Sequence, residues 1–107
     1  MTSFDEREKA AEGKFVHDEE MLFRAHARRD RKLGLWAAGL MHKPGDSALA
    51  YAEALVAAEI STGREDAVSA KVLKDLATTG LIRSEAEVKA KMQELLAEAM
   101  AELRAGK

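Results

Sequence analysis

The chain of 107 residues has no cysteine, a single proline and few aromatic residues: three Phe, one Trp and one Tyr. Without cysteine, neither a disulfide nor a thiolate metal site can form. No apolar run approaches the length of a membrane span. The charged N-terminus MTSFDEREKAAEG also lacks the apolar core of a secretory signal. These absences predict a cytoplasmic protein with no direct membrane insertion.

The composition favours one helical domain. Hydrophobic residues make up 47% of the chain and charged residues 34%, and the abundant Ala, Glu, Lys and Leu are all good helix formers. No strand pattern competes with the helical periodicity. Short connections between four amphipathic segments predict an all-α fold, a four-helix bundle over residues 18–107 that follows a mobile N-terminal arm over residues 1–17.

Four helices are expected, each from its apolar stripe and its end signals. The first runs from near Asp18 to the Pro44–Gly45 stop, the second from Asp46 or Ser47 to Ile60, the third over about 64–78 with Gly80 after it, and the fourth from a Ser84–Glu87 cap to about Arg104. A Thr62–Glu65 capping box is expected before the third helix. The predicted stripe of the first helix is Leu22, His26, Arg29, Leu33, Trp36 and Leu40, and that of the second is Leu49, Ala52, Leu55, Val56 and Ile60. The stripe of the third is Val68, Val72, Leu73 and Leu76, and that of the fourth is Val88, Met92, Leu95, Leu96, Ala99 and Leu103. Leu81 and Ile82 are expected in the core.

Trp36 is expected as a core anchor, and Gly34 and Gly39 indicate close helix packing or a bend.

Residues 1–17 carry few large apolar side chains, so little buried area offsets the entropy of ordering them. The segment nevertheless has helical features. Ser3 and Glu6 fit a capping box, and Phe4 and Phe15 share a helical stripe. It is expected to be mobile in the isolated protein and able to form a helix on a surface.

The first helix carries a basic belt, Arg24, Arg28, Arg31 and Lys32. We favour the interpretation that the belt is a solvated face paired with acids of the fourth helix, Glu87, Glu94 and Glu98. It can also be a docking surface for an acidic partner. The acidic segments on both sides of the belt argue against nucleic-acid binding, because nucleic-acid-binding domains usually carry a net positive charge.

The three histidines form no metal-ligand pattern, and no phosphate-binding loop or catalytic pair is present.

The run FDEREKAAEGKFVHDEEMLFRAHARRDRKLGLWAAGLM, with YAEALVAAEI, EDAVSAKVLKDL and KAKMQELLAEA after it, resembles the zeta subunit, the ATPase inhibitor of alphaproteobacterial F-type ATP synthases. The resemblance covers nearly the whole chain. It implies a four-helix bundle with a protruding N-terminal arm. It also implies a non-enzymatic protein whose arm blocks rotation of the catalytic head in the hydrolysis direction.

The resemblance further implies contacts with the alpha, beta and gamma subunits, a location peripheral to the inner membrane when bound, no cofactor, and a monomer when free. The arm residues that match the family pattern are Ser3, Phe4, Asp5, Arg7, Glu8, Lys14 and Phe15. The alternative function is a small sensor module that binds ATP or ADP weakly through the basic belt.

Two positions depart from the family pattern. Gly13 stands where relatives usually have a better helix former. Asp30 stands in place of an Asn, which is expected to alter the local charge within the basic belt.

Overall fold

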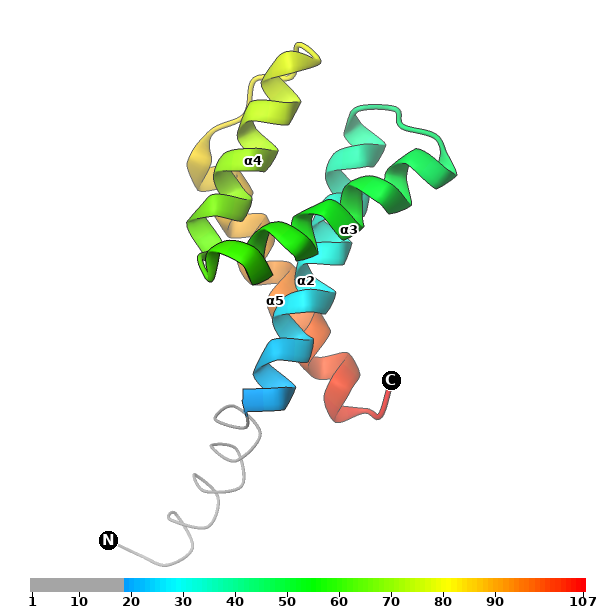
Figure 1. Cartoon of the computed structure of the whole chain (residues 1–107), viewed down its shortest axis with the longest axis vertical. Coiled ribbons are helices and arrows are strands. Elements are labelled where there is room, and N and C mark those ends of the chain that lie inside the picture. Colours follow the sequence, from blue (N-terminus) through cyan, green and yellow to red (C-terminus); the bar gives the residue numbers. More distant parts are fainter. Residues whose placement is uncertain (1–18) are drawn as a thin grey trace, which may run out of the picture.

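The structure is a computed structural model that describes residues 19–107. These residues form four helices and no strand: α2 (Glu19–Leu40), α3 (Gly45–Thr62), α4 (Glu65–Thr78) and α5 (Glu85–Arg104). Helix α2 contacts each of the other three, and α3 crosses it (Figure 1). The predicted all-α fold of four helices is therefore confirmed. The predicted arm lies outside the described residues.

The middle of α2 is lined by small residues. Its buried positions are Ala25, Arg29, Asp30, Leu33, Gly34, Ala37 and Ala38. The predicted stripe is therefore buried at Arg29 and Leu33 and half-buried at Leu22, His26, Trp36 and Leu40. Trp36 is only half-buried and packs at the margin of the core, with the Lys91 Nζ 5.7 Å from the centre of its ring. Trp36 therefore contacts the core, as predicted, but from its margin, and smaller residues fill the centre of the contact.

Gly34 marks the crossing of α2 and α3. A Cβ atom at this position would lie 2.5 Å from the Ala52 Cα atom, closer than packed atoms ever approach. A Cβ atom at Gly39 would meet nothing within 4 Å. The expectation of close helix packing therefore holds at Gly34, where it comes from contact with the backbone of α3.

The crossing also decides which side chains of α3 are covered. Its buried residues are Ala52, Leu55 and Val56, near its middle. Leu49 and Ile60 were expected on the buried stripe but are 53% and 59% exposed. A helix that crosses its neighbour is covered near the contact point, so the ends of its apolar stripe remain open to solvent.

The end of α4 and the start of α5 follow their sequence signals. The Glu87 N–H donates to Ser84 Oγ at 3.0 Å, as the predicted cap of α5 requires. After α4, Gly80 adopts a positive φ of 85°, and the Leu81 N–H returns to the Leu76 carbonyl at 2.9 Å. Leu81 packs against the core, but Ile82 is 83% exposed, so its predicted burial was wrong.

One hydrophobic core joins the four helices. Its members are Leu33, Ala37, Leu55, Val68, Val72, Leu76, Val88, Met92 and Leu95. On α5 the predicted stripe was right at five positions, and the sixth, Leu96, is half-buried. None of the helices described here is long and apolar enough to cross a membrane.

Replacing Gly34 by Ala should destabilise the bundle by about 1–3 kcal/mol, because the new methyl group would force the two helices apart. The matched control is Gly39→Ala, which has free space around it and should stabilise the helix by up to about 1 kcal/mol through propensity alone. Urea denaturation followed by circular dichroism measures both. Equal effects of the two substitutions would contradict the crossing contact.

Candidate functional site

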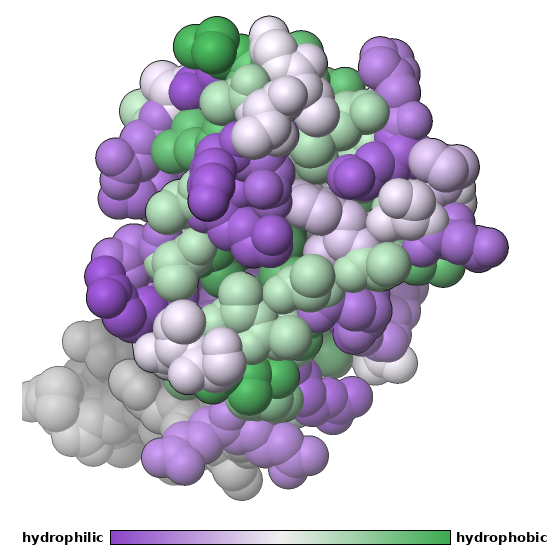
Figure 2. Space-filling view, turned by 45° about the horizontal axis from the view of Figure 1, so that its top comes forward, coloured by the Kyte–Doolittle hydropathy of each residue, from purple (hydrophilic) through white to green (hydrophobic). Residues whose placement is uncertain are grey.

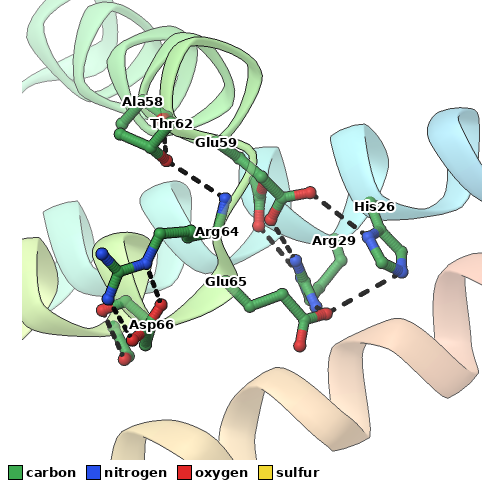
Figure 3. A network of polar contacts seen from close by, with 10 residues as sticks. His26, Arg29, Ala58, Glu59, Thr62, Arg64, Glu65 and Asp66 are labelled. Carbon is green, nitrogen blue, oxygen red and sulfur yellow. Dashed lines mark hydrogen bonds and ion pairs between the residues drawn. The ribbon is translucent and has the colours of Figure 1, made fainter.

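A buried arginine joins three helices at one end of the bundle. Arg29 is 2% exposed and Asp30 is fully buried, both in the middle of α2. The Arg29 Nε donates to Asp30 Oδ1 at 2.9 Å, Nη1 donates to Glu65 Oε1 at 2.6 Å, and Nη2 donates to Glu59. Glu59 lies near the end of α3 and Glu65 begins α4, so one guanidinium links α2 to both (Figure 3).

The turn between α3 and α4 places the two glutamates. Gly63 adopts a left-handed φ of 66°, and its N–H donates to the Glu59 carbonyl. Arg64 is extended and occupies the N-cap position of α4 without a side-chain cap. Thr62 Oγ1 accepts from the Arg64 N–H at 3.2 Å and donates to the Ala58 carbonyl at 2.7 Å. The predicted Thr62–Glu65 capping box is therefore wrong, because the Glu65 carboxylate binds Arg29 instead.

His26 lies one turn before Asp30 and completes this group. Its Nδ1 is 3.2 Å from Glu59 Oε2, and its Nε2 is 3.8 Å from Glu65 Oε1. The hydrogen bond with Glu59 raises the pKa of His26 above its ordinary value, against the opposing effect of partial burial. We call His26, Arg29, Asp30, Glu59 and Glu65 the Arg29 cluster.

Asp30 holds its proton much more tightly than a surface carboxyl. Burial raises its pKa to about 7, although the neighbouring Arg29 charge favours ionisation. A hydrogen bond with Glu59 and the charge of Glu59 also raise the pKa of Asp30. Burial also disfavours ionised Glu59, but its hydrogen bonds with His26 and Asp30 outweigh burial and lower its pKa. The shared proton therefore resides on Asp30.

The position of Asp30 corrects the expectation that it alters the charge of the basic belt. Its side chain is 1% exposed and lies inside the bundle, on the other side of α2. Asp30 Oδ1 accepts from the Arg29 Nε at 2.9 Å. An Asn at this position has the same shape and the same pattern of one acceptor and one donor group. Relative to the Asn that the resemblance predicts at this position, Asp30 adds a titratable proton.

The basic belt is divided between two neighbouring helices. Arg28 and Lys32 face α5: Arg28 Nη1 lies 3.2 Å from Glu102 Oε1, and the Lys32 Nζ lies 2.6 Å from Glu98 Oε1 and 2.7 Å from Glu102 Oε2. Arg31 faces α3 and donates to Glu53 at 2.6 Å. Exposed pairs of this kind contribute roughly 0–1 kcal/mol each.

The acids that meet the belt differ in part from those expected. Glu98 does face it, as predicted. Glu87 instead pairs with Arg83 and Glu94 with Lys91, within or next to their own helix. Glu102 and Glu53 were not anticipated. The remaining belt residue, Arg24, contacts the sulfur of Met21 at 4.0 Å.

The predicted arm residues are not among those that the structure describes. Ser3, Phe4, Asp5, Arg7, Glu8, Lys14 and Phe15 all precede residue 19, and their role stays a prediction. Sequence reasoning missed the Arg29 cluster. Its only signal was the pair of polar residues, His26 and Arg29, in the middle of an apolar stripe. Within residues 19–107, no group of three or more acids and histidines is arranged to hold a metal ion.

The protein is a small all-α bundle, and the buried polar side chains of its Arg29 cluster bind one another. Comparison with known families identifies the family more closely: the model for ATPase inhibitor subunit zeta matches residues 1–102. The chain belongs to the ATPase inhibitor subunit zeta family, as the sequence resemblance predicted. No curated protein sequence matches it.

Replacing Arg29 by Met should destabilise the bundle by roughly 3–5 kcal/mol, because Asp30 and Glu59 would lose the buried guanidinium that binds them. The matched control Arg31→Met removes an exposed pair with Glu53 and should cost about 1 kcal/mol or less. Chemical denaturation of both variants at pH 7 checks this. Similar costs for the two would show that Arg29 is not the structural centre of the cluster.

The pKa of Asp30 predicts a stability that falls as pH rises. The folded state keeps a proton up to about pH 7 that the unfolded state releases near pH 4, so stability declines by up to about 1 kcal/mol per pH unit between these values. The raised pKa of His26 acts in the same direction from about pH 6.5 upward. The lowered pKa of Glu59 acts in the opposite direction, only below about pH 4.5.

Asp30→Asn should therefore flatten the decline between pH 5 and pH 8 and make the protein more stable than the wild type at pH 8. The exposed Asp46, in the first turn of α3, supplies the control Asp46→Asn, which should leave the slope unchanged. Free energies of unfolding in urea at a series of pH values give the result. An Asp30→Asn variant with the wild-type slope would place the proton elsewhere.

Proposed function

We propose that this protein binds the catalytic head of an F-type ATP synthase and blocks its rotation in the hydrolysis direction. Its family is that of an ATPase inhibitor subunit, which indicates a regulatory rather than a catalytic role. The observation that carries the proposal is the extent of the family match. Residues 1–102 include both the N-terminal segment and almost all of the bundle, so both parts belong to the family's pattern.

In this proposal residues 1–17 are the inhibitory arm and residues 18–107 are the anchor. A division of this kind is supported by the location of the core. All buried hydrophobic residues in the described part of the chain lie between Ala25 and Leu103. The bundle therefore has a core of its own, built from side chains that follow the arm. The partners would be the alpha, beta and gamma subunits of the ATP synthase.

The proposed contacts of the arm are Ser3, Phe4, Asp5, Arg7, Glu8, Lys14 and Phe15. Charged residues alone would form a contact that salt weakens strongly. The two phenylalanines supply the large apolar side chains that usually anchor an interface. A segment that orders on its target loses conformational entropy there, so each anchor must contribute substantially to affinity.

The alternative, a nucleotide sensor that uses the basic belt, has less support. Three of the four belt residues, Arg28, Arg31 and Lys32, already contact carboxylates. A nucleotide phosphate would have to displace these carboxylates before it could bind. Such a site would need a further source of affinity.

Deleting residues 1–17 should leave the helical content and thermal midpoint of the bundle nearly unchanged and abolish inhibition of ATP hydrolysis. Phe4→Ala combined with Phe15→Ala should raise the half-inhibitory concentration by about tenfold or more. Lys9→Ala with Glu12→Ala, two arm residues outside the proposed contacts, is the control and should have a smaller effect. The assay is ATP hydrolysis by the purified catalytic head. Full inhibition by the truncated chain would move the inhibitory element into the bundle.

A further inference from the structure

A groove of about 420 Å³ lies between the start of α2 and the end of α3, next to the Arg29 cluster. We call it the α2–α3 groove. Its apolar wall consists of Leu22, Phe23, Ala27, Val56 and Ile60. Phe23 and Ile60 are 56% and 59% exposed, although both are large apolar side chains. The volume is within the range of sites that accept a few side chains of a ligand or partner.

The placement of these two residues is unusual for this surface. The face shown in Figure 2 carries both hydrophobic (green) and hydrophilic (purple) side chains. Leu49 and Ile82 are exposed to a similar or greater degree but do not line this groove. Single exposed apolar residues are ordinary, whereas neighbouring ones in a hollow mark a binding surface.

The polar part of the groove is acidic. Glu19, Asp30, Glu59 and Glu65 line it, together with His26, and no Lys or Arg side chain does. The one cation beneath it, Arg29, is 2% exposed and already bound to carboxylates. An occupant must therefore present apolar side chains and at least one positive charge.

We propose that the α2–α3 groove is the surface by which the bundle docks on the catalytic head, and that it receives a helix with an apolar face edged by Lys or Arg. The inference rests on the proposed function. The groove begins at Glu19, directly after the proposed arm. A target that holds residues 1–17 is consequently next to the groove, so arm and groove form one continuous contact surface.

Charge disfavours the two other occupants. Residues 1–18 of the chain contain five acids and three Lys or Arg, so this segment would bring net negative charge to an acidic groove. A second copy docked face to face about a two-fold axis would bring the exposed Glu19 and Glu65 of both copies to one interface. A basic and apolar helix of another protein has neither problem.

The test compares two pairs of full-length variants that match in chemistry and differ in position. Phe23→Ser and Ile60→Ser change the groove, and Leu49→Ser and Ile82→Ser change exposed apolar residues elsewhere. Glu19→Lys reverses a charge that lines the groove. Glu20→Lys reverses its exposed neighbour in the same first turn of α2, outside the groove. Both substitutions place a lysine in the first turn of α2, where the helix dipole acts on it in the same way. A difference in affinity between the two variants therefore measures the contribution of the groove.

The dissociation constant for the purified catalytic head and the inhibition of ATP hydrolysis are measured for each variant. The groove variants should bind about tenfold or more weakly, as is usual for apolar anchors of an interface, and the controls should bind within about twofold of the wild type. Groove variants that bind like the controls would overturn the docking surface while leaving the proposed function intact. A wild-type chain that neither binds nor inhibits would overturn both.

The methyl signal of Ile60 in the NMR spectrum of the free, full-length protein tests whether the groove holds the chain's own arm or a second copy. The chemical shift of this signal should not change in the Phe4→Ala, Phe15→Ala double variant or on dilution. A change with the double variant would place the chain's own arm in the groove. A change on dilution would place a second copy there. Either result would overturn the proposed occupant.

Discussion

The buried charge of Arg29 is the constraint around which this bundle is arranged. A guanidinium removed from water needs carboxylates in matching positions, and they come from α2, α3 and α4. An apolar core tolerates small changes in helix position, whereas a hydrogen-bonded charge in a dry site does not. Buried ion pairs often add little net stability over apolar residues. We therefore infer that the chief effect of Arg29 is to select one arrangement of the three helices.

The second constraint is steric and lies one turn further along the same helix. Gly34 allows the backbones of α2 and α3 to touch at Ala52, and this crossing leaves the far ends of α3 uncovered. One of these ends carries Glu59, which binds Arg29, and Ile60, which remains exposed beside the cluster. The close contact of Gly34 with Ala52 therefore packs the middle of α3 against α2 and leaves the α2–α3 groove at the end of α3 that carries Ile60.

The cluster also gives the bundle a proton-dependent element. Below about pH 7 Asp30 carries a proton, so the buried Arg29 faces one neutral carboxyl group and two carboxylates. Above this pH a further negative charge is buried beneath an already acidic groove. Stability and the charge of the proposed docking surface are thereby linked through the same residue.

Much of the fold could be predicted because its signals are local. The helical periods, the Ser84 cap and the stop at Gly80 each depend on a few neighbouring residues, and these predictions held. The family resemblance was equally readable, because it rests on a long run of residue identities. The candidate site was much less predictable. Arg29 was noticed only as a polar position in an apolar stripe, while Glu59 and Glu65 carried no mark that distinguished them from surface acids.

The sequence by itself determined the four helices, their approximate bounds and the family. The tertiary structure decided which face of α2 is buried, why Gly34 and not Trp36 lies at the closest contact, and why Ile60 and Ile82 stay exposed. The physical reason is that helix formation depends on residues three or four positions apart, which the sequence displays directly. Burial, ion pairing across 30 or more residues and the pKa of Asp30 depend on where the helices cross, and that depends on all four helices packing together.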